Sequence, residues 1–124
     1  MSMPDLATGV ESRLVTISAV EFAEDAPKTG TVTFTLPCDL RHADSGTIIA
    51  AGSRTVTLAN GYAELRLFTD NPGLTSDRIS RRHGDTWAVL VKKSWEPRPY
   101  PIRVPAGTTD ISLAEIPAFD WRSQ

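Results

Sequence analysis

Short segments in which apolar and polar residues alternate recur along most of this chain. In residues 31–36, Val32, Phe34 and Leu36 alternate with three threonines. A two-residue repeat places successive side chains on opposite faces of a strand, so this pattern is typical of a half-buried β-strand. Similar segments, some of them apolar on both faces, lie at residues 14–20, 47–50, 54–59, 63–68, 87–92, 100–105 and 110–113. This series predicts an all-β sandwich of seven or eight strands without a secure helix.

The strongest local signal is the Asn-Gly pair at residues 60–61, which lies between two alternating segments. Both central residues of a two-residue hairpin turn need a positive φ, and asparagine and glycine tolerate it best. Counting outward from the turn predicts a hairpin in which Leu58 lies opposite Ala63. In the same register Val56 lies opposite Leu65, and the polar residues between them occupy the other face.

Two later segments predict different places in a sheet. Residues 87–92 are apolar on both faces, which favours a central strand with Trp87 in the core. Residues 100–105 contain Pro101 and Pro105, which cannot donate to a neighbouring strand, and so predict an edge strand. The stretches 37–46 and 69–85 are polar and rich in turn residues, and we expect both to be loops.

The length of 124 residues fits one domain with a two-layer core. Residues 1–12 lack alternation and contain Pro4 and Gly9, so we expect an N-terminal arm there. The sandwich domain is predicted to span residues 13–117, and residues 118–124 to form a C-terminal tail.

Net charge and hydropathy exclude several classes of partner. A formal charge of −2 and a pI near 5.6 argue against a general nucleic-acid binder, which needs a basic face. No segment approaches the ~20 apolar residues of a membrane helix. The first residues have neither the basic start nor the apolar run of a signal peptide, so we expect synthesis in the cytoplasm. The single Cys38 cannot form an internal disulfide and is interpreted as a structural residue.

Motifs that carry chemistry are not evident, so we expect no catalytic residues and no cofactor. The two histidines, His42 and His83, lie far apart in sequence and both fall in predicted loops. A metal site built from His83 with Asp77 or Asp85 has too few ligands of defined spacing to be favoured. An enzymatic function would have to use these histidines, and we do not expect one.

Three groups of residues are candidates for contact with a partner. The arginines of the loop before residue 87 either are solvated or bind an acidic neighbour through forked hydrogen bonds. The aromatic residues near residue 97 either cover one end of the sandwich or stack on a sugar or a partner. The apolar tail docks either on its own domain or, as we favour, on another subunit. The candidate interaction residues are Arg78, Arg81, Arg82, Trp95, Tyr100, Phe119 and Trp121.

The order of several degenerate motifs carries a family resemblance. A Gly-x-Val-x-Phe strand is followed by an Asn-Gly turn and an Asp-Asn-Pro turn, then by Trp-x-Val, Tyr-x-Ile-x-Val-Pro and a Leu-Ala-x-Ile-x-Pro close. These motifs occupy residues 29–34, 60–65, 69–72, 87–89, 100–105 and 110–117. Taken in order, these motifs resemble those of a small module in minor tail proteins of phages that infect actinobacteria. That module often forms the N-terminal part of a tail-fibre or baseplate protein. The resemblance covers about residues 13–117.

This resemblance implies a single immunoglobulin-like or prealbumin-like antiparallel β-sandwich that is not an enzyme. It implies a structural component of a tailed-phage virion, made in the host cytoplasm and assembled with other virion proteins and with copies of itself. In the longer proteins a fibre follows the close, whereas this sequence ends seven residues later at Gln124, which favours an adaptor, a baseplate subunit or a capsid surface protein. The alternative is a carbohydrate-binding module that contacts a host surface glycan.

Overall fold

Strands make up nearly all of the regular structure in the computed structural model, which describes residues 10–23, 26–43, 45–71, 73–76 and 87–119. The all-β prediction is confirmed, although ten strands, rather than seven or eight, and one 3-10 helix occur in the described residues. They are β1 (Ser12–Ser18), β2 (Thr31–Leu36), β3 (Leu40–His42), β4 (Ile48–Ile49), β5 (Gly52–Thr57), β6 (Tyr62–Phe68), β7 (Leu74–Ser76), β8 (Val89–Lys93), β9 (Tyr100–Ile102), β10 (Ile111–Ser112) and η1 (Leu113–Glu115).

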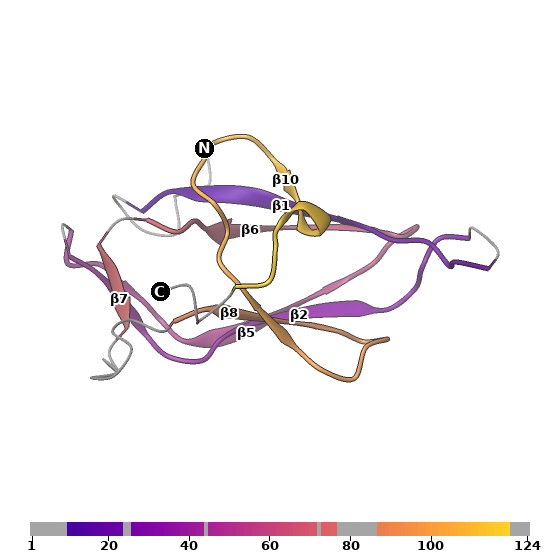
Figure 1. Ribbon diagram of the computed structural model, residues 1–124, viewed down its shortest axis with the longest axis horizontal. Helices are drawn as coiled ribbons and strands as arrows, with labels where there is room; N and C mark the ends of the chain where they lie inside the picture. Colours follow the sequence, from indigo (N-terminus) through magenta and orange to yellow (C-terminus); the bar gives the residue numbers. More distant parts are fainter. Residues whose placement is uncertain (1–9, 24–25, 44, 72, 77–86, 120–124) are drawn as a thin grey trace.

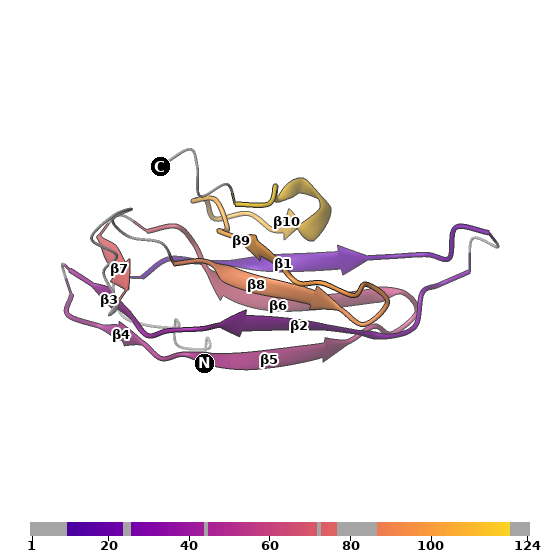
Figure 2. The same cartoon turned by 60° about the horizontal axis from the view of Figure 1, so that its bottom comes forward.

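Two sheets face each other across the core, in agreement with the predicted β-sandwich (Figure 1). One has the strand order β10-β1-β6 and the other β5-β2-β8-β9. A third, small sheet with the order β4-β3-β7 lies at one end of the long axis (Figure 2). Every pair of strands is antiparallel except β1 and β10, which run parallel in the described part of the chain.

The alternating residues form the core as the sequence predicted. Val15 and Ile17 of β1 are buried, as are Val32 and Phe34 of β2, while their neighbours along each strand are half-buried or, at Ser18, exposed. Trp87 is buried two residues before the start of β8, which lies between β2 and β9. The predicted edge strand is also confirmed, because β9 ends the four-stranded sheet.

The hairpin prediction is correct for the turn but wrong for the pairing of the two flanking strands. Asn60 and Gly61 have φ values of 53° and 77°, and Ala59 and Tyr62 exchange backbone hydrogen bonds of 2.9 and 3.0 Å. Beyond that bridge the strands separate, because β5 pairs with β2 and β6 pairs with β1. The turn therefore carries the chain from one layer to the other (Figure 1). The apolar residues of the two strands face each other across the core rather than sharing one face of a sheet.

Two predicted loops contain strands. The stretch 37–46 includes β3, and the stretch 69–85 includes β7, with which β3 pairs. Leu40 and Leu74 anchor these strands because both side chains are buried. At the N-terminal side, Val10 is buried and β1 begins at Ser12, so the folded domain reaches into the segment that we expected to be an arm.

A narrow projection extends from the end of the molecule opposite the small sheet (Figure 1). We call residues 19–28 the finger; residues 24 and 25 lie outside the described part. At its base Ala19 donates to the Gly61 carbonyl at 2.8 Å and accepts from the Lys28 amide at 3.0 Å. Farther out, Glu21 donates to the Ala26 carbonyl at 2.6 Å. The finger is thus a hydrogen-bonded ribbon, and its Phe22 side chain is fully exposed.

Candidate functional site

Two of the seven candidate residues lie together. Trp95 and Tyr100 line one pocket, while Phe119 lies elsewhere on the domain. The other four, Arg78, Arg81, Arg82 and Trp121, lie outside the described residues. The pocket shared by Trp95 and Tyr100 is therefore the candidate site that the structure can describe.

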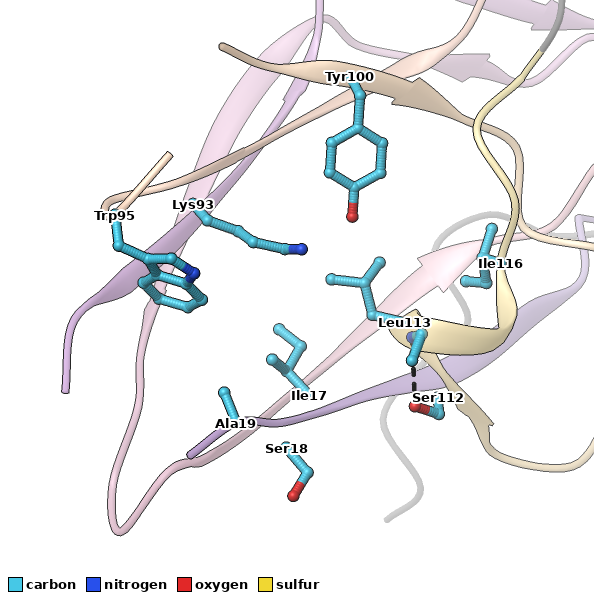
Figure 3. A pocket seen from close by; sticks show the side chains of 10 residues that line it. Ile17, Ser18, Ala19, Lys93, Trp95, Tyr100, Ser112, Leu113 and Ile116 are labelled. Carbon is cyan, nitrogen blue, oxygen red and sulfur yellow. Dashed lines mark hydrogen bonds between the residues drawn. The ribbon is translucent and has the colours of Figure 1, made fainter. Parts of the chain in front are cut away.

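This pocket, which we call the edge pocket, lies where the two layers meet and has a volume of about 270 Å³. Lys93, Trp95 and Tyr100 come from β8, β9 and the turn between them. Ile17, Ser18 and Ala19 come from β1 and the residue after it, and Ser112, Leu113, Ala114 and Ile116 come from β10, η1 and the residue after η1. Figure 3 shows the aromatic rings and Lys93 facing Leu113 and Ile17 across the pocket.

The turn after β8 fixes the position of Trp95. The Thr31 amide donates to Ser94 Oγ at 3.1 Å, and the Ser94 amide donates to the Thr31 carbonyl at 2.9 Å. Gly30 has a φ of 137°, and a Cβ atom on it would lie 2.5 Å from Ser94 Oγ and 3.2 Å from the Trp95 ring. Only glycine allows this approach without displacing the turn, so the residue before β2 helps to shape the pocket.

Lysine ammonium groups lie over both aromatic rings. Lys93 Nζ lies 5.3 Å from the centre of the Tyr100 ring and 3.6 Å from Glu96 Oε1. Lys28 Nζ lies 5.3 Å from the centre of the Trp95 ring and forms an ion pair with Glu21 at 3.3 Å. Each ring thus has a cation–π contact on one face. The pocket combines apolar walls with an ammonium group, which suits an apolar or amphipathic ligand better than a strongly polar one.

Phe119 packs on its own domain, which was one of the two alternatives left open for the tail. The Arg103 guanidinium carbon lies 4.1 Å from the centre of the Phe119 ring and 4.2 Å from the centre of the Trp87 ring. Arg103 Nε donates to the Trp87 carbonyl at 2.9 Å, and the Phe119 amide donates to the Pro101 carbonyl at 2.8 Å. The planar guanidinium is therefore stacked between two aromatic rings and attaches the tail to the sandwich.

Replacing Arg103 with lysine is expected to lower the free energy of unfolding by about 1–2 kcal/mol, because an ammonium group cannot stack on two rings at once. The amide of Phe119 should then exchange hydrogen faster. Chemical denaturation and hydrogen exchange measure the two effects. Arg54→Lys, at an exposed position on β5, is the control. Equal stability of the two variants would contradict the stacking interpretation.

The histidine and cysteine side chains have structural surroundings where they are described. His42 is buried in β3, and its Nδ1 lies 2.8 Å from Ser45 Oγ. Cys38 is half-buried and packs against the core, as the structural interpretation requires. The metal hypothesis involving His83, Asp77 and Asp85 falls outside the described residues, and within them no three His, Cys, Asp or Glu side chains gather closely enough to hold a metal ion.

Sequence reasoning found the aromatic wall of the edge pocket but missed Leu113 and Ile116 on the opposite wall. Their apolar character was visible, yet nothing local placed them beside Trp95. The described part of the chain also has no helix of the length and apolarity that a membrane span needs. Comparison with protein-family models and with curated proteins finds no match to this chain.

Proposed function

We propose that this protein is a non-enzymatic structural component of a tailed-phage virion: a minor tail, baseplate or fibre-adaptor protein. It acts through assembly with other virion proteins and with copies of itself. The order of strand and turn motifs along residues 29–117 supports the virion assignment by resemblance. The observation that carries the assembly role is the fully exposed Phe22 on the finger.

Apolar exposure on this domain supports contact with other proteins. Besides Phe22, the side chains of Val20 and Ile48 are 56% and 62% exposed. Val20 lies on the finger, whereas Ile48 belongs to β4 in the small sheet at the other end of the molecule (Figure 2). Val20 and Phe22 lie two residues apart on the finger, and aromatic residues are enriched in the centres of protein interfaces, so the finger suits contact with another protein.

The virion assignment is tested on purified particles. The reading frames beside this gene identify the particle, and an antibody against the protein is then applied to purified particles in the electron microscope. We expect labelling at one fixed position on the tail or the particle surface. Particles that contain none of the protein by mass spectrometry, although infected cells produce it, would contradict the assignment.

A second candidate function, binding of a host surface polysaccharide, is favoured by the pairing of Trp95 with Tyr100 in the edge pocket. Aromatic rings at a pocket wall can stack on the apolar face of a sugar. Against this, the lysine contacts already cover one face of each ring. A glycan would have to use the remaining surface of each ring.

Retention on cell-wall polysaccharide tests this second function. If the edge pocket binds a glycan, Trp95→Ala should reduce retention by about tenfold or more, since a stacked aromatic contributes on the order of 1.5 kcal/mol. Tyr62→Ala, which removes a half-exposed aromatic side chain outside the edge pocket, should leave retention unchanged. The absence of retention on any of a broad set of polysaccharides would exclude the carbohydrate function.

A further inference from the structure

We propose that the finger of one molecule docks through Phe22 into a pocket at the opposite end of a second copy of this chain. The receiving site, which we call the end pocket, has a volume of about 260 Å³ and lies beside β4, at the end of the molecule away from the finger (Figure 2). Its apolar walls are formed by Phe34, Leu36, Ile49, Leu67, Phe68 and Val89. The proposal uses the assembly role proposed above but does not depend on the particle being a virion.

The finger places Phe22 next to an ordered, hydrogen-bonded stretch of backbone. Two backbone hydrogen bonds, at 2.6 and 3.0 Å, and the Lys28–Glu21 ion pair at 3.3 Å join the two sides of the ribbon between Phe22 and the domain. A third bond, at 2.8 Å, attaches the base of the ribbon to Gly61. Docking a side chain from ordered backbone costs less conformational entropy than docking one on an unstructured loop. Phe22 is therefore suited to act as an apolar anchor in a partner's pocket.

The end pocket offers what such an anchor needs. Its walls come from both layers, because Phe34 belongs to β2 and Phe68 to β6. Gly52, on the edge strand β5, also lines the pocket, and a Cβ atom built on it meets no described residue within 4 Å. The walls formed by the described residues are thus mostly apolar, and those residues leave the pocket open beside Gly52.

Charge favours a second copy as the occupant. Residues 19–28 contain Glu21, Glu24 and Asp25 but only one basic residue, Lys28, so the finger has a net charge of −2. Among the described residues that line the end pocket, Arg54 is the charged one. Opposite charges on the two surfaces favour their encounter and fix the direction of docking.

The position of the two features sets the symmetry of the assembly. The finger and β4, whose Ile49 lines the end pocket, lie at opposite ends of the molecule (Figure 2). An interface between two different surfaces of the same chain is heterologous, so repeated docking produces a ring if the rotation closes and a filament if it does not. Head-to-tail association of this kind needs no further protein.

Sedimentation of the full chain over a range of concentrations tests the proposal. The wild-type protein should associate reversibly, and Phe22→Ala should weaken the association by about tenfold or more, as expected from losing the burial of a phenylalanine ring. Phe22→Leu should retain most of it. Gly52→Trp, which fills the end pocket, should weaken association to a similar degree. Ala114→Trp fills the edge pocket instead and should leave association unchanged.

A mixing experiment separates this mode of docking from others. The Phe22→Ala protein keeps its end pocket, and the Gly52→Trp protein keeps its finger. Mixed at a concentration at which each variant alone is monomeric, they should form a 1:1 dimer and nothing larger. Circular dichroism and thermal unfolding verify that both variants are folded.

Three results would overturn the proposal. The first is a wild-type protein that stays monomeric up to about 1 mM, which would assign the finger to a different partner. The second is that Ala114→Trp weakens association and Gly52→Trp does not, which would assign the finger to the edge pocket. The third is the failure of the two folded variants to form a dimer. None of these results bears on whether the protein occurs in purified particles, so the virion assignment is tested separately.

Discussion

Replacing Arg13 with methionine is expected to lower the free energy of unfolding by about 3 kcal/mol. Arg13 occupies an inward-facing position on β1, in line with Val15 and Ile17, and only 9% of its surface is exposed. Methionine keeps most of the apolar stem but has no donor group. The decrease in the free energy of unfolding should therefore measure the contribution of the guanidinium hydrogen bonds rather than that of side-chain packing.

Those hydrogen bonds attach the segment between β9 and β10 to the first sheet. Arg13 Nε donates to the Thr109 carbonyl at 2.8 Å, and Nη1 donates to the carbonyls of Pro105 and Ala106 at 3.0 and 3.3 Å. Nη2 donates to Thr109 Oγ1 at 3.3 Å. Hydrogen bonds from a charged, nearly buried group are among the stronger ones in proteins, and here one side chain makes four.

The same replacement should loosen β10 and the edge pocket. Only two residue pairs join β10 to β1, Val15 with Ile111 and Thr16 with Ser112. Without Arg13, the amides of β10 should exchange hydrogen at least tenfold faster than those of β2, since local opening then costs less than global unfolding. Because Leu113 follows β10 and lines the edge pocket, any ligand of that pocket should also bind more weakly.

Arg66→Met is the matched control for Arg13→Met. Arg66 lies on β6 beside β1, but it is exposed, and its hydrogen bonds to Ser12 are long, at 3.3 and 3.4 Å. We expect its replacement to change stability by less than about 0.5 kcal/mol. Denaturation in urea compares the two variants. An equally small effect at both positions would show that Arg13 does not hold the segment before β10.

The contrast between Arg13 and the rest of β1 shows what the sequence could predict about the fold. Alternation identified β1 and β2 and the inward residues of both, because the direction of a side chain on a strand is a local property. An arginine at an inward position interrupts the apolar pattern, so the predicted strand began after it. Strands β3 and β7 were missed because three residues are too few to establish an alternation.

Pairing between strands depends on distant parts of the chain. The type of turn at residues 60–61 is determined by two local residues and was predicted correctly, but the partner of each flanking strand was not. β5 pairs along its length with β2, and β6 with β1. A hairpin signature contains no information about such alternative partner strands. The candidate site divides in the same way. Trp95 and Tyr100 are close in sequence, whereas Leu113 reaches them only through the parallel pairing of β10 with β1.

Replacing Gly61 with alanine is expected to destabilise the protein by about 3 kcal/mol, through two effects at one position. The φ of Gly61 is 77°, a conformation that costs an L-residue about 1 kcal/mol. A Cβ atom there would also collide with the carbonyl oxygen of Ala19 and lie 3.3 Å from the Lys28 amide nitrogen. Both contacts are with backbone at the base of the finger, which cannot yield as a flexible side chain would.

Two other glycines separate these effects. Gly46 has a φ of 71°, and a Cβ atom on it would meet none of the described residues within 4 Å, so Gly46→Ala should show the conformational cost alone, about 1 kcal/mol. A Cβ atom on Gly52 likewise meets no described residue within 4 Å, and no positive φ opposes it, so Gly52→Ala should cause no loss of stability. Denaturation midpoints of the three variants, at a constant m-value, measure the differences.

The comparison of Gly61→Ala with Gly46→Ala then tests whether the finger is held rigidly. If the base of the finger is fixed by the hydrogen bond between Ala19 and Gly61, the collision must be relieved by moving the whole ribbon, and the additional loss should be about 2 kcal/mol. The displaced finger should also weaken head-to-tail association, although Phe22 and the end pocket are both unchanged. Equal stabilities of the two variants would mean that the ribbon yields easily. Phe22 would then lack the fixed position that makes it an effective anchor.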